Sequence, residues 1–267
     1  MISDITLGQY IPGNSLLHRA DPRTKIILTL LYMVIIFLLN SYTTYGIFVL
    51  FTLLVIIVSD IPIRYTLKGL KPILFIMFFA VAINVFTTQG TPVFEYGFIH
   101  ITWEGLDLSG KLAIRLVLLV VSASLLTFTT TPILLTDGME LLMKPLNRIG
   151  VPVHEIAMMM SIALRFIPTL LLETDKIMKA QAARGADFDT GNLLQKAKSF
   201  IPVLVPLFIS AFRRADELAT AMEARCYRGS EGRTKMKQLK FTGVDVKISA
   251  VMAVITVGLL YLQFFKV

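Results

Sequence analysis

Long runs of apolar residues are the feature that most limits what this 267-residue chain can fold into. Five runs stand out, each bounded by polar or charged residues: Ile26–Leu39, Tyr45–Val58, Ile73–Phe86, Leu112–Phe128 and Ile248–Phe265. A helix needs about 20 mostly apolar residues to cross a bilayer, so the shorter runs must extend into their flanks. The sequence therefore predicts an all-α, polytopic membrane protein with about five transmembrane helices.

The composition supports a membrane protein and argues against other classes. Only 16% of the residues are charged, against about 25% in ordinary soluble domains, and the mean hydropathy is +0.72. A soluble enzyme and a disordered chain are both poor fits to these values. Cys226 is the only cysteine and there are three histidines, so we expect no intrachain disulfide and no metal site.

Lysine and arginine are confined to alternate segments between the apolar runs. Residues 1–25 and 59–72 hold three each and residues 129–245 hold sixteen, whereas residues 40–44 and 87–110 hold none. Cytoplasmic loops of membrane proteins are enriched in Lys and Arg. We therefore expect a multi-pass protein of the cell membrane whose N-terminus and residues 129–245 are cytoplasmic. The net charge of +8 then reflects these loops, and no nucleic-acid partner is expected.

The order of these segments suggests three regions. They are an N-terminal membrane bundle of about four transmembrane helices (1–130), a cytoplasmic helical region (131–245) and a C-terminal transmembrane helix (246–267). Helical periodicity in the middle region predicts three helices, at Leu134–Ile149, Val153–Arg184 and Leu193–Arg225. The second is apolar in its first half and charged in its second, so we expect it to lie along the membrane face before entering the cytosol.

The second and third of these helices end in similar tripeptides, Ala183-Arg184-Gly185 and Ala224-Arg225-Cys226. A cation at a helix C-terminus is stabilised by the helix dipole, so each arginine could be no more than a cap. Alternatively, the small neighbours leave the guanidinium free to enter a groove on another protein and donate several hydrogen bonds there. Arg228 follows closely and is a second candidate for the same role. The pattern alone leaves both explanations open.

Two apolar groups in the middle region are candidate contact surfaces. One is the run Met158, Met159 and Met160, and the other is part of an amphipathic stripe that includes Leu204, Phe208 and Phe212. Methionine side chains adapt to surfaces of different shape. Either group could instead pack within the protein's own helices, and the sequence does not separate the two interpretations.

Four segments, in order along the chain, resemble a known family. They are Gly8-Gln9-Tyr10 through Asp21-Pro22-Arg23-Thr24-Lys25, then Ala163–Pro168, Gln181–Gly185 and Ala221–Cys226. Together they resemble the transmembrane (T) subunit of energy-coupling factor transporters, the EcfT/CbiQ family. The paired arginine tripeptides carry most of the specificity of this resemblance.

The resemblance implies a non-catalytic T component of an ABC-type importer of vitamins or other micronutrients. Two cytosolic ABC ATPase subunits (EcfA type) would bind ATP and Mg, and this chain would hold no cofactor. The resemblance implies that Ala183, Arg184 and Gly185 dock one ATPase, and that Ala224, Arg225 and Cys226 dock the other. It also implies a membrane-embedded, substrate-binding S component, for which the two apolar groups are candidate contacts.

Two other functions compete with this interpretation. A self-contained secondary transporter or channel would need polar or broken spans, whereas the apolar runs here are nearly uniform. A membrane enzyme would need clustered acidic or histidine side chains at the membrane face, and the sequence displays no such cluster. The chain also lacks the glycine-rich P-loop pattern of ATP-binding proteins.

Overall fold

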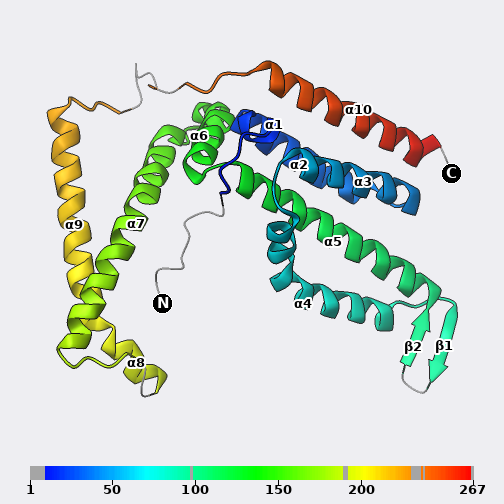
Figure 1. Ribbon diagram of the computed structural model, residues 1–267, viewed down its shortest axis with the longest axis horizontal. Coiled ribbons are helices and arrows are strands. Elements are labelled where there is room, and N and C mark those ends of the chain that lie inside the picture. The colour runs from blue at the N-terminus through cyan, green and yellow to red at the C-terminus, as the bar shows by residue number, and fades with distance from the viewer. Residues whose placement is uncertain (1–9, 97–98, 189–191, 230–235, 237, 266–267) are drawn as a thin grey trace. The chain divides into compact units, whose positions relative to one another are not determined.

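A computed structural model of the chain describes residues 10–96, 99–188, 192–229, 236 and 238–265. In chain order its elements are α1 (Leu16–Arg19), α2 (Pro22–Leu38), α3 (Tyr42–Val58), α4 (Ile63–Thr87), β1 (Pro92–Tyr96), β2 (Ile99–Thr102), α5 (Trp103–Thr129), α6 (Pro132–Met143), the 3₁₀ helix η1 (Lys144–Ile149), α7 (Val153–Ala183), α8 (Leu193–Ser199), α9 (Ile201–Ala224) and α10 (Gly243–Phe265) (Figure 1). Helices dominate, which confirms the all-α membrane architecture that the sequence predicts.

Four helices in the described part of the chain are long and apolar enough to cross a membrane: α4, α5, α7 and α10. Three of them contain expected spans, and the remaining two expected spans form α2 and α3, which have 17 residues each. Length and composition therefore do not distinguish α7 from a span. Its 31 residues nevertheless divide into an apolar half and a charged half, as the sequence suggests.

The described residues form two compact units, and one of them comprises Gly8–Leu141 with Gln238–Val267. Its core has two clusters of buried side chains. The larger joins α2, α3, α5 and α10 through Tyr32, Ile35, Ile36, Leu39, Tyr45, Phe48, Leu118, Met252 and Leu259. The smaller joins α3 and α5 through Ile56, Ile61, Val121, Leu125 and Phe128. The last helix of the chain thus packs with the first long ones.

A short antiparallel hairpin, β1–β2, precedes α5 in the same unit. The sequence analysis treats residues 87–110 as a loop, so this hairpin was not expected. Thr102 caps α5, since its side chain accepts a hydrogen bond from the backbone N–H of Gly105. The hairpin therefore leads directly into the long helix that packs along α4 (Figure 1).

The other unit comprises Leu142–Lys237 and contains α7, α8 and α9. The expectation of a single helix over Leu193–Arg225 is wrong, because the chain turns at Phe200 between α8 and α9. Pro202 lies in the first turn of α9, where its missing N–H costs nothing, but it could not continue the hydrogen bonding of α8. In contrast, Pro168 lies within α7, which continues on both sides of it.

The first of the three expected helices, Leu134–Ile149, also differs in its second half. Its last six residues form the tighter η1 helix and not a continuation of α6. Pro145 lies in the first turn of η1 and cannot donate to the preceding α-helical turn. Gly150 then ends the segment in a left-handed conformation, with φ of +85°.

Candidate functional site

The helices α7 and α9 end in the same backbone geometry. At the end of α7, the N–H of Ala186 donates to the carbonyl of Gln181 and the N–H of Gly185 to that of Ala182, both at 3.0 Å. These two hydrogen bonds, together with a residue in the left-handed conformation, form a Schellman motif. Gly185 supplies the left-handed residue, with φ of +90°.

The end of α9 repeats this arrangement with different residues. The N–H of Tyr227 donates to the carbonyl of Met222 at 3.0 Å, and the N–H of Cys226 to that of Glu223 at 2.8 Å. Cys226 occupies the left-handed position, with φ of +57°. A non-glycine residue is uncommon there, because its Cβ approaches the backbone. The sequence analysis does not predict this conformation.

Arg184 and Arg225 occupy equivalent positions in these two motifs. Both are the C-cap residues of their helices, with backbone angles of −89° and 6° for Arg184 and −94° and 14° for Arg225. Both side chains are exposed, as are the preceding Ala183 and Ala224. The two arginines are therefore presented to solvent by the same local framework.

Arg228 differs from Arg225 in its setting. It lies beyond the end of α9 and precedes Gly229, which has φ of +81°. Although Arg228 is also exposed, it does not cap a helix. Arg225, and not Arg228, thus has the same backbone geometry as Arg184. The role of either arginine in docking stays a prediction.

The helices α7 and α9 pack against each other and run in opposite directions (Figure 1). Nη2 of Arg214 lies 2.8 Å from Oε2 of Glu173, and both side chains are partly buried. Towards the other end of α7, the side-chain N–H of Gln181 donates to the carbonyl of Pro202 at 3.4 Å. From the first contact to the second, the residue number rises on α7, from Glu173 to Gln181, and falls on α9, from Arg214 to Pro202. The two helices are therefore antiparallel.

This antiparallel packing separates the two arginines. Arg184 lies three residues beyond Gln181, at the end of the pair where α9 begins, and Arg225 lies at the far end of α9. At 1.5 Å per helical residue, the two C-caps are about 40 Å apart along the helix axes. The structure therefore presents two similar but separate sites.

The candidate apolar contact residues lie on the same two helices. Met159 and Met160 are exposed, as are Leu204, Phe208 and Phe212, whereas Met158 is partly buried. Three further exposed residues extend the α9 group at helical spacing, and the sequence analysis missed them: Ile201, Val205 and Ile209. Other members of the amphipathic stripe are partly buried: Leu207, Ala211 and Leu218. Only part of the apolar stripe of α9 is thus covered by other parts of the chain, and the rest is exposed.

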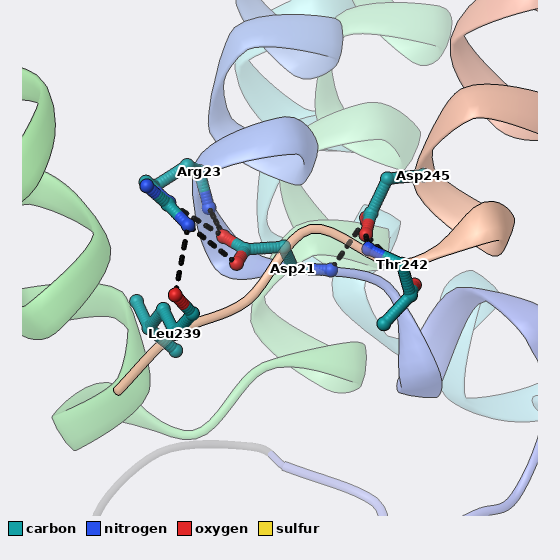
Figure 2. Close-up of polar contacts among 5 residues, drawn as sticks. All are labelled: Asp21, Arg23, Leu239, Thr242 and Asp245. Carbon is teal, nitrogen blue, oxygen red and sulfur yellow. Dashed lines mark hydrogen bonds and ion pairs between the residues drawn. The ribbon is translucent and has the colours of Figure 1, made fainter. Parts of the chain in front are cut away.

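A polar cluster joins the starts of α2 and α10 in the other unit (Figure 2). Asp21 caps α2 by accepting from the backbone N–H of Arg23 at 2.9 Å, and forms an ion pair with its guanidinium at 3.0 Å. Arg23 also donates to the carbonyl of Leu239 at 3.2 Å. This side chain therefore ties the segment before α10 to the start of α2.

Asp245 completes this cluster from the first turn of α10. Its Oδ1 accepts from the backbone N–H of Asp21 at 2.7 Å, and its Oδ2 accepts from the N–H and the hydroxyl of Thr242 at 2.7 and 2.8 Å (Figure 2). Asp245 is only 3% exposed. The sequence analysis missed this residue, because a lone aspartate far from Asp21 in the sequence carries no pairing signal.

Lys25 follows in the same segment, immediately before the apolar run that begins at Ile26. Its Nζ donates to the carbonyl of Thr129 at 2.9 Å and to the hydroxyl of Thr130 at 3.2 Å, at the end of α5. Burial lowers the pKa of Lys25 to about 8, and the nearby carboxylates only partly oppose this effect. One short segment, Asp21–Lys25, thereby fixes α2 to both α5 and α10.

Comparison with known proteins identifies a family and several relatives of this chain. The family model described as CbiQ, "Cobalt transport protein", matches residues 13–236. A protein of Ruminiclostridium cellulolyticum is 64% identical over 264 residues, which cover 99% of each chain. One of Clostridium kluyveri is 58% identical over 92% of each chain. One of Bacillus subtilis is 48% identical, over 98% of this chain and 100% of its own.

All three relatives bear the name "Energy-coupling factor transporter transmembrane protein EcfT". The matched range includes Asp21–Lys25 as well as both arginine motifs. The family match and these nearly full-length relatives establish that the chain belongs to the EcfT/CbiQ family of transmembrane proteins of energy-coupling factor transporters.

Proposed function

We propose that this chain is the non-catalytic transmembrane component of an importer that is driven by two cytosolic ATPase subunits. In this proposal Arg184 docks in a groove of one ATPase subunit and Arg225 in a groove of the other. ATP and Mg²⁺ are bound by those subunits and not by this chain. The observation that carries the proposal is the repeated helix end, which holds an exposed guanidinium in the same backbone frame at both sites.

The separation of the two sites favours two partner subunits over a single contact. Arg184 and Arg225 lie at opposite ends of the α7–α9 pair, about 40 Å apart along the helix axes. A helix cap would need no such exposure, since it could lie against its own helix. An exposed arginine can instead donate hydrogen bonds at fixed geometry to carboxylates or carbonyls of a partner.

A separate membrane-embedded S component would bind the substrate and contact the exposed apolar side chains of α7 and α9. The candidate contacts are Met158, Met159, Met160, Leu204, Phe208 and Phe212, with Ile201, Val205 and Ile209 as additions. Large exposed apolar surfaces rimmed by polar residues are typical of protein or membrane contacts. The cargo, a vitamin or another micronutrient, would then be chosen by the S component.

The proposal includes an orientation in the cell membrane. The N-terminus and residues 129–245 are cytoplasmic, as the lysine and arginine distribution predicts. The apolar half of α7 lies along the membrane face and its charged half extends towards the ATPases. Movement of the ATPase subunits during ATP hydrolysis would then reach the S component through α7 and α9.

Purification of the tagged chain from its native host in mild detergent, with mass spectrometry of the bound proteins, tests the proposal first. We expect two ATPase chains and at least one small hydrophobic protein. The double variant Arg184→Ala with Arg225→Glu should lose the ATPase chains and uptake, and each single variant should be milder. Arg213→Ala is the matched control, because Arg213 is an exposed arginine of α9 away from its end.

Normal ATPase recovery and normal uptake in the double variant would contradict the assignment of the arginines. Purification of the chain without any ATPase would contradict the coupling mechanism itself. That second result would favour a self-contained transporter.

A further inference from the structure

An apolar groove of about 410 Å³ lies among the helices of the unit that contains Asp21 and Asp245. Residues of α1, α2, α3, α5 and α10 line it, and almost all of the lining atoms are apolar. It has no role in the proposed docking of ATPase subunits or an S component, all of which involves α7 and α9. The groove thus needs an explanation of its own.

The groove has a buried floor and an accessible rim. Tyr32, Leu125 and Met252 in the lining are nearly inaccessible, at 7%, 7% and 4% exposed. Leu54 of α3 and Val251 of α10 also line it, yet each is more than half exposed. The groove is therefore open between α3 and α10, where the surface is apolar and would face lipid chains.

The two ends of the groove differ in polarity. Lys25 and Lys247 line one end. The hydroxyls of Tyr32 and Thr52 also line the groove and satisfy each other at 2.7 Å, which leaves no free polar group there. Lys25 and Tyr32 are seven residues apart on α2, so these ends are about 10 Å apart. A molecule that fills the groove must combine an apolar chain with a polar group that can lie beside two lysine side chains.

The charge at the lysine end favours an anion. Asp21 and Asp245 are nearby, but Asp21 is paired with Arg23, and Asp245 accepts hydrogen bonds from backbone and threonine groups. Lys25 donates only to uncharged oxygens, and Lys247 is exposed. The aspartate charges are thus engaged within the protein, whereas neither lysine has a carboxylate at ion-pair distance in the described part of the chain.

We infer that this groove binds one anionic phospholipid, with an acyl chain between α3 and α10 and the headgroup phosphate beside Lys25 and Lys247. Each methylene buried against apolar side chains stabilises the bound lipid. Basic residues between membrane helices on the cytoplasmic side attract anionic headgroups. The predicted orientation places the lysine end on that side, because both lysines adjoin segments expected to be cytoplasmic.

Native mass spectrometry of the delipidated, full-length protein in detergent tests this site. The probes are dioleoyl phosphatidylglycerol and dioleoyl phosphatidylcholine, which share their acyl chains and differ in net charge. We expect tighter binding of phosphatidylglycerol at one site. Lys247→Gln should weaken phosphatidylglycerol binding about fivefold and leave phosphatidylcholine binding unchanged.

A second variant tests the acyl chain separately from the charge. Val251→Trp should fill the groove and reduce the binding of both lipids. Val254→Trp is its matched control, because Val254 lies on the same helix, is exposed and does not line the groove. Lys68→Gln is the control for charge, since Lys68 is an exposed lysine of α4 outside the groove.

Equal binding of the two lipids, or unchanged lipid binding in Val251→Trp, would overturn the inference. A loss of partner subunits in Val251→Trp with lipid binding intact would also overturn it, because a protein would then occupy the groove. These results are independent of Arg184 and Arg225. The proposal of a lipid site can therefore be wrong while the proposal of ATPase docking is right, and the reverse also holds.

Discussion

Gly185 and Cys226 adopt the same left-handed backbone conformation at the ends of two different helices. Glycine accepts this conformation readily, whereas a residue with a Cβ pays about 1–2 kcal/mol for it. The hydrogen bonds that close α9 match those that close α7 despite this difference. The geometry of the helix end is thus the same where the residue at the left-handed position does not favour it.

Replacement of Gly185 by alanine should destabilise the end of α7 by about 1 kcal/mol, because alanine is strained at this φ. Hydrogen exchange at the amides of Gly185 and Ala186 should then become about fivefold faster. Gly258→Ala is the control, since Gly258 lies within α10, has no positive φ and has open space around it. Unchanged exchange in Gly185→Ala would mean that the left-handed turn does not hold this helix end.

The single cysteine of the chain reports directly on the second arginine motif. Cys226 is exposed and lies next to Arg225, so a membrane-impermeant maleimide should label it in inside-out vesicles and not in intact cells. Bound ATPase subunits should protect it from the reagent. Cys226→Ser, which removes the only thiol, is the control for background. Labelling from outside the cell would contradict the predicted orientation.

The ion pair between Glu173 and Arg214 should stabilise the packing of α7 on α9. Both side chains are partly buried, at 24% and 33% exposed, so we expect a contribution of about 1 kcal/mol. Arg214→Ala should speed hydrogen exchange in both helices, and the charge-swapped double variant should partly restore protection. The exposed pair of Arg213 and Glu217 on α9 serves as control, with side chains 81% and 71% exposed. Similar effects at the two pairs would argue against a specific helix contact.

Removal of the Asp245 carboxylate should destabilise the membrane bundle. Asp245→Ala leaves the N–H groups of Asp21 and Thr242 without their acceptor. Asp21 is buried, so its unsatisfied N–H costs about 1–3 kcal/mol. The apparent melting temperature in a fixed detergent should fall, and less so for Asp245→Asn, which keeps one oxygen. Asp107→Ala is the control, because its carboxylate is 42% exposed and pairs with Lys111 near the start of α5, with a further contact to Tyr42. Equal melting of Asp245→Ala and Asp107→Ala would refute this role.

Features determined by neighbouring residues could be predicted from the sequence. Asp21 followed by Pro22 identifies the start of α2, and Gly185 identifies the end of α7, because each supplies a local backbone requirement. The apolar runs likewise locate the long helices, since the bilayer imposes their length and composition. The arginine pair was recognised for the same reason, because each motif is contiguous.

The tripeptide Phe-Ile-Pro occurs twice in the chain and lies in a different structural position each time. Phe166-Ile167-Pro168 lies inside α7, whereas Phe200-Ile201-Pro202 begins α9. A proline permits either result, because it is accommodated in a first turn and can also be tolerated within a long helix. The sequence therefore gave no basis for expecting the break at Phe200.

Contacts between segments that are far apart in the sequence could not be predicted either. Asp21 and Asp245 are 224 residues apart, and the residues around either one carry no sign that they meet. The left-handed Cys226 was hidden for a different reason, because cysteine does not favour that conformation. Both features follow from tertiary structure that surrounds residues of ordinary local preference.

The hydrogen bond from Asp21 to Asp245 also bears on how the protein is made. The ribosome completes α2 long before it reaches α10, so the N–H of Asp21 emerges without its eventual acceptor. The bundle can close around this group only after the final helix has entered the membrane. The contact between α2 and α10 can therefore form only after α3, α4 and α5 have been synthesised.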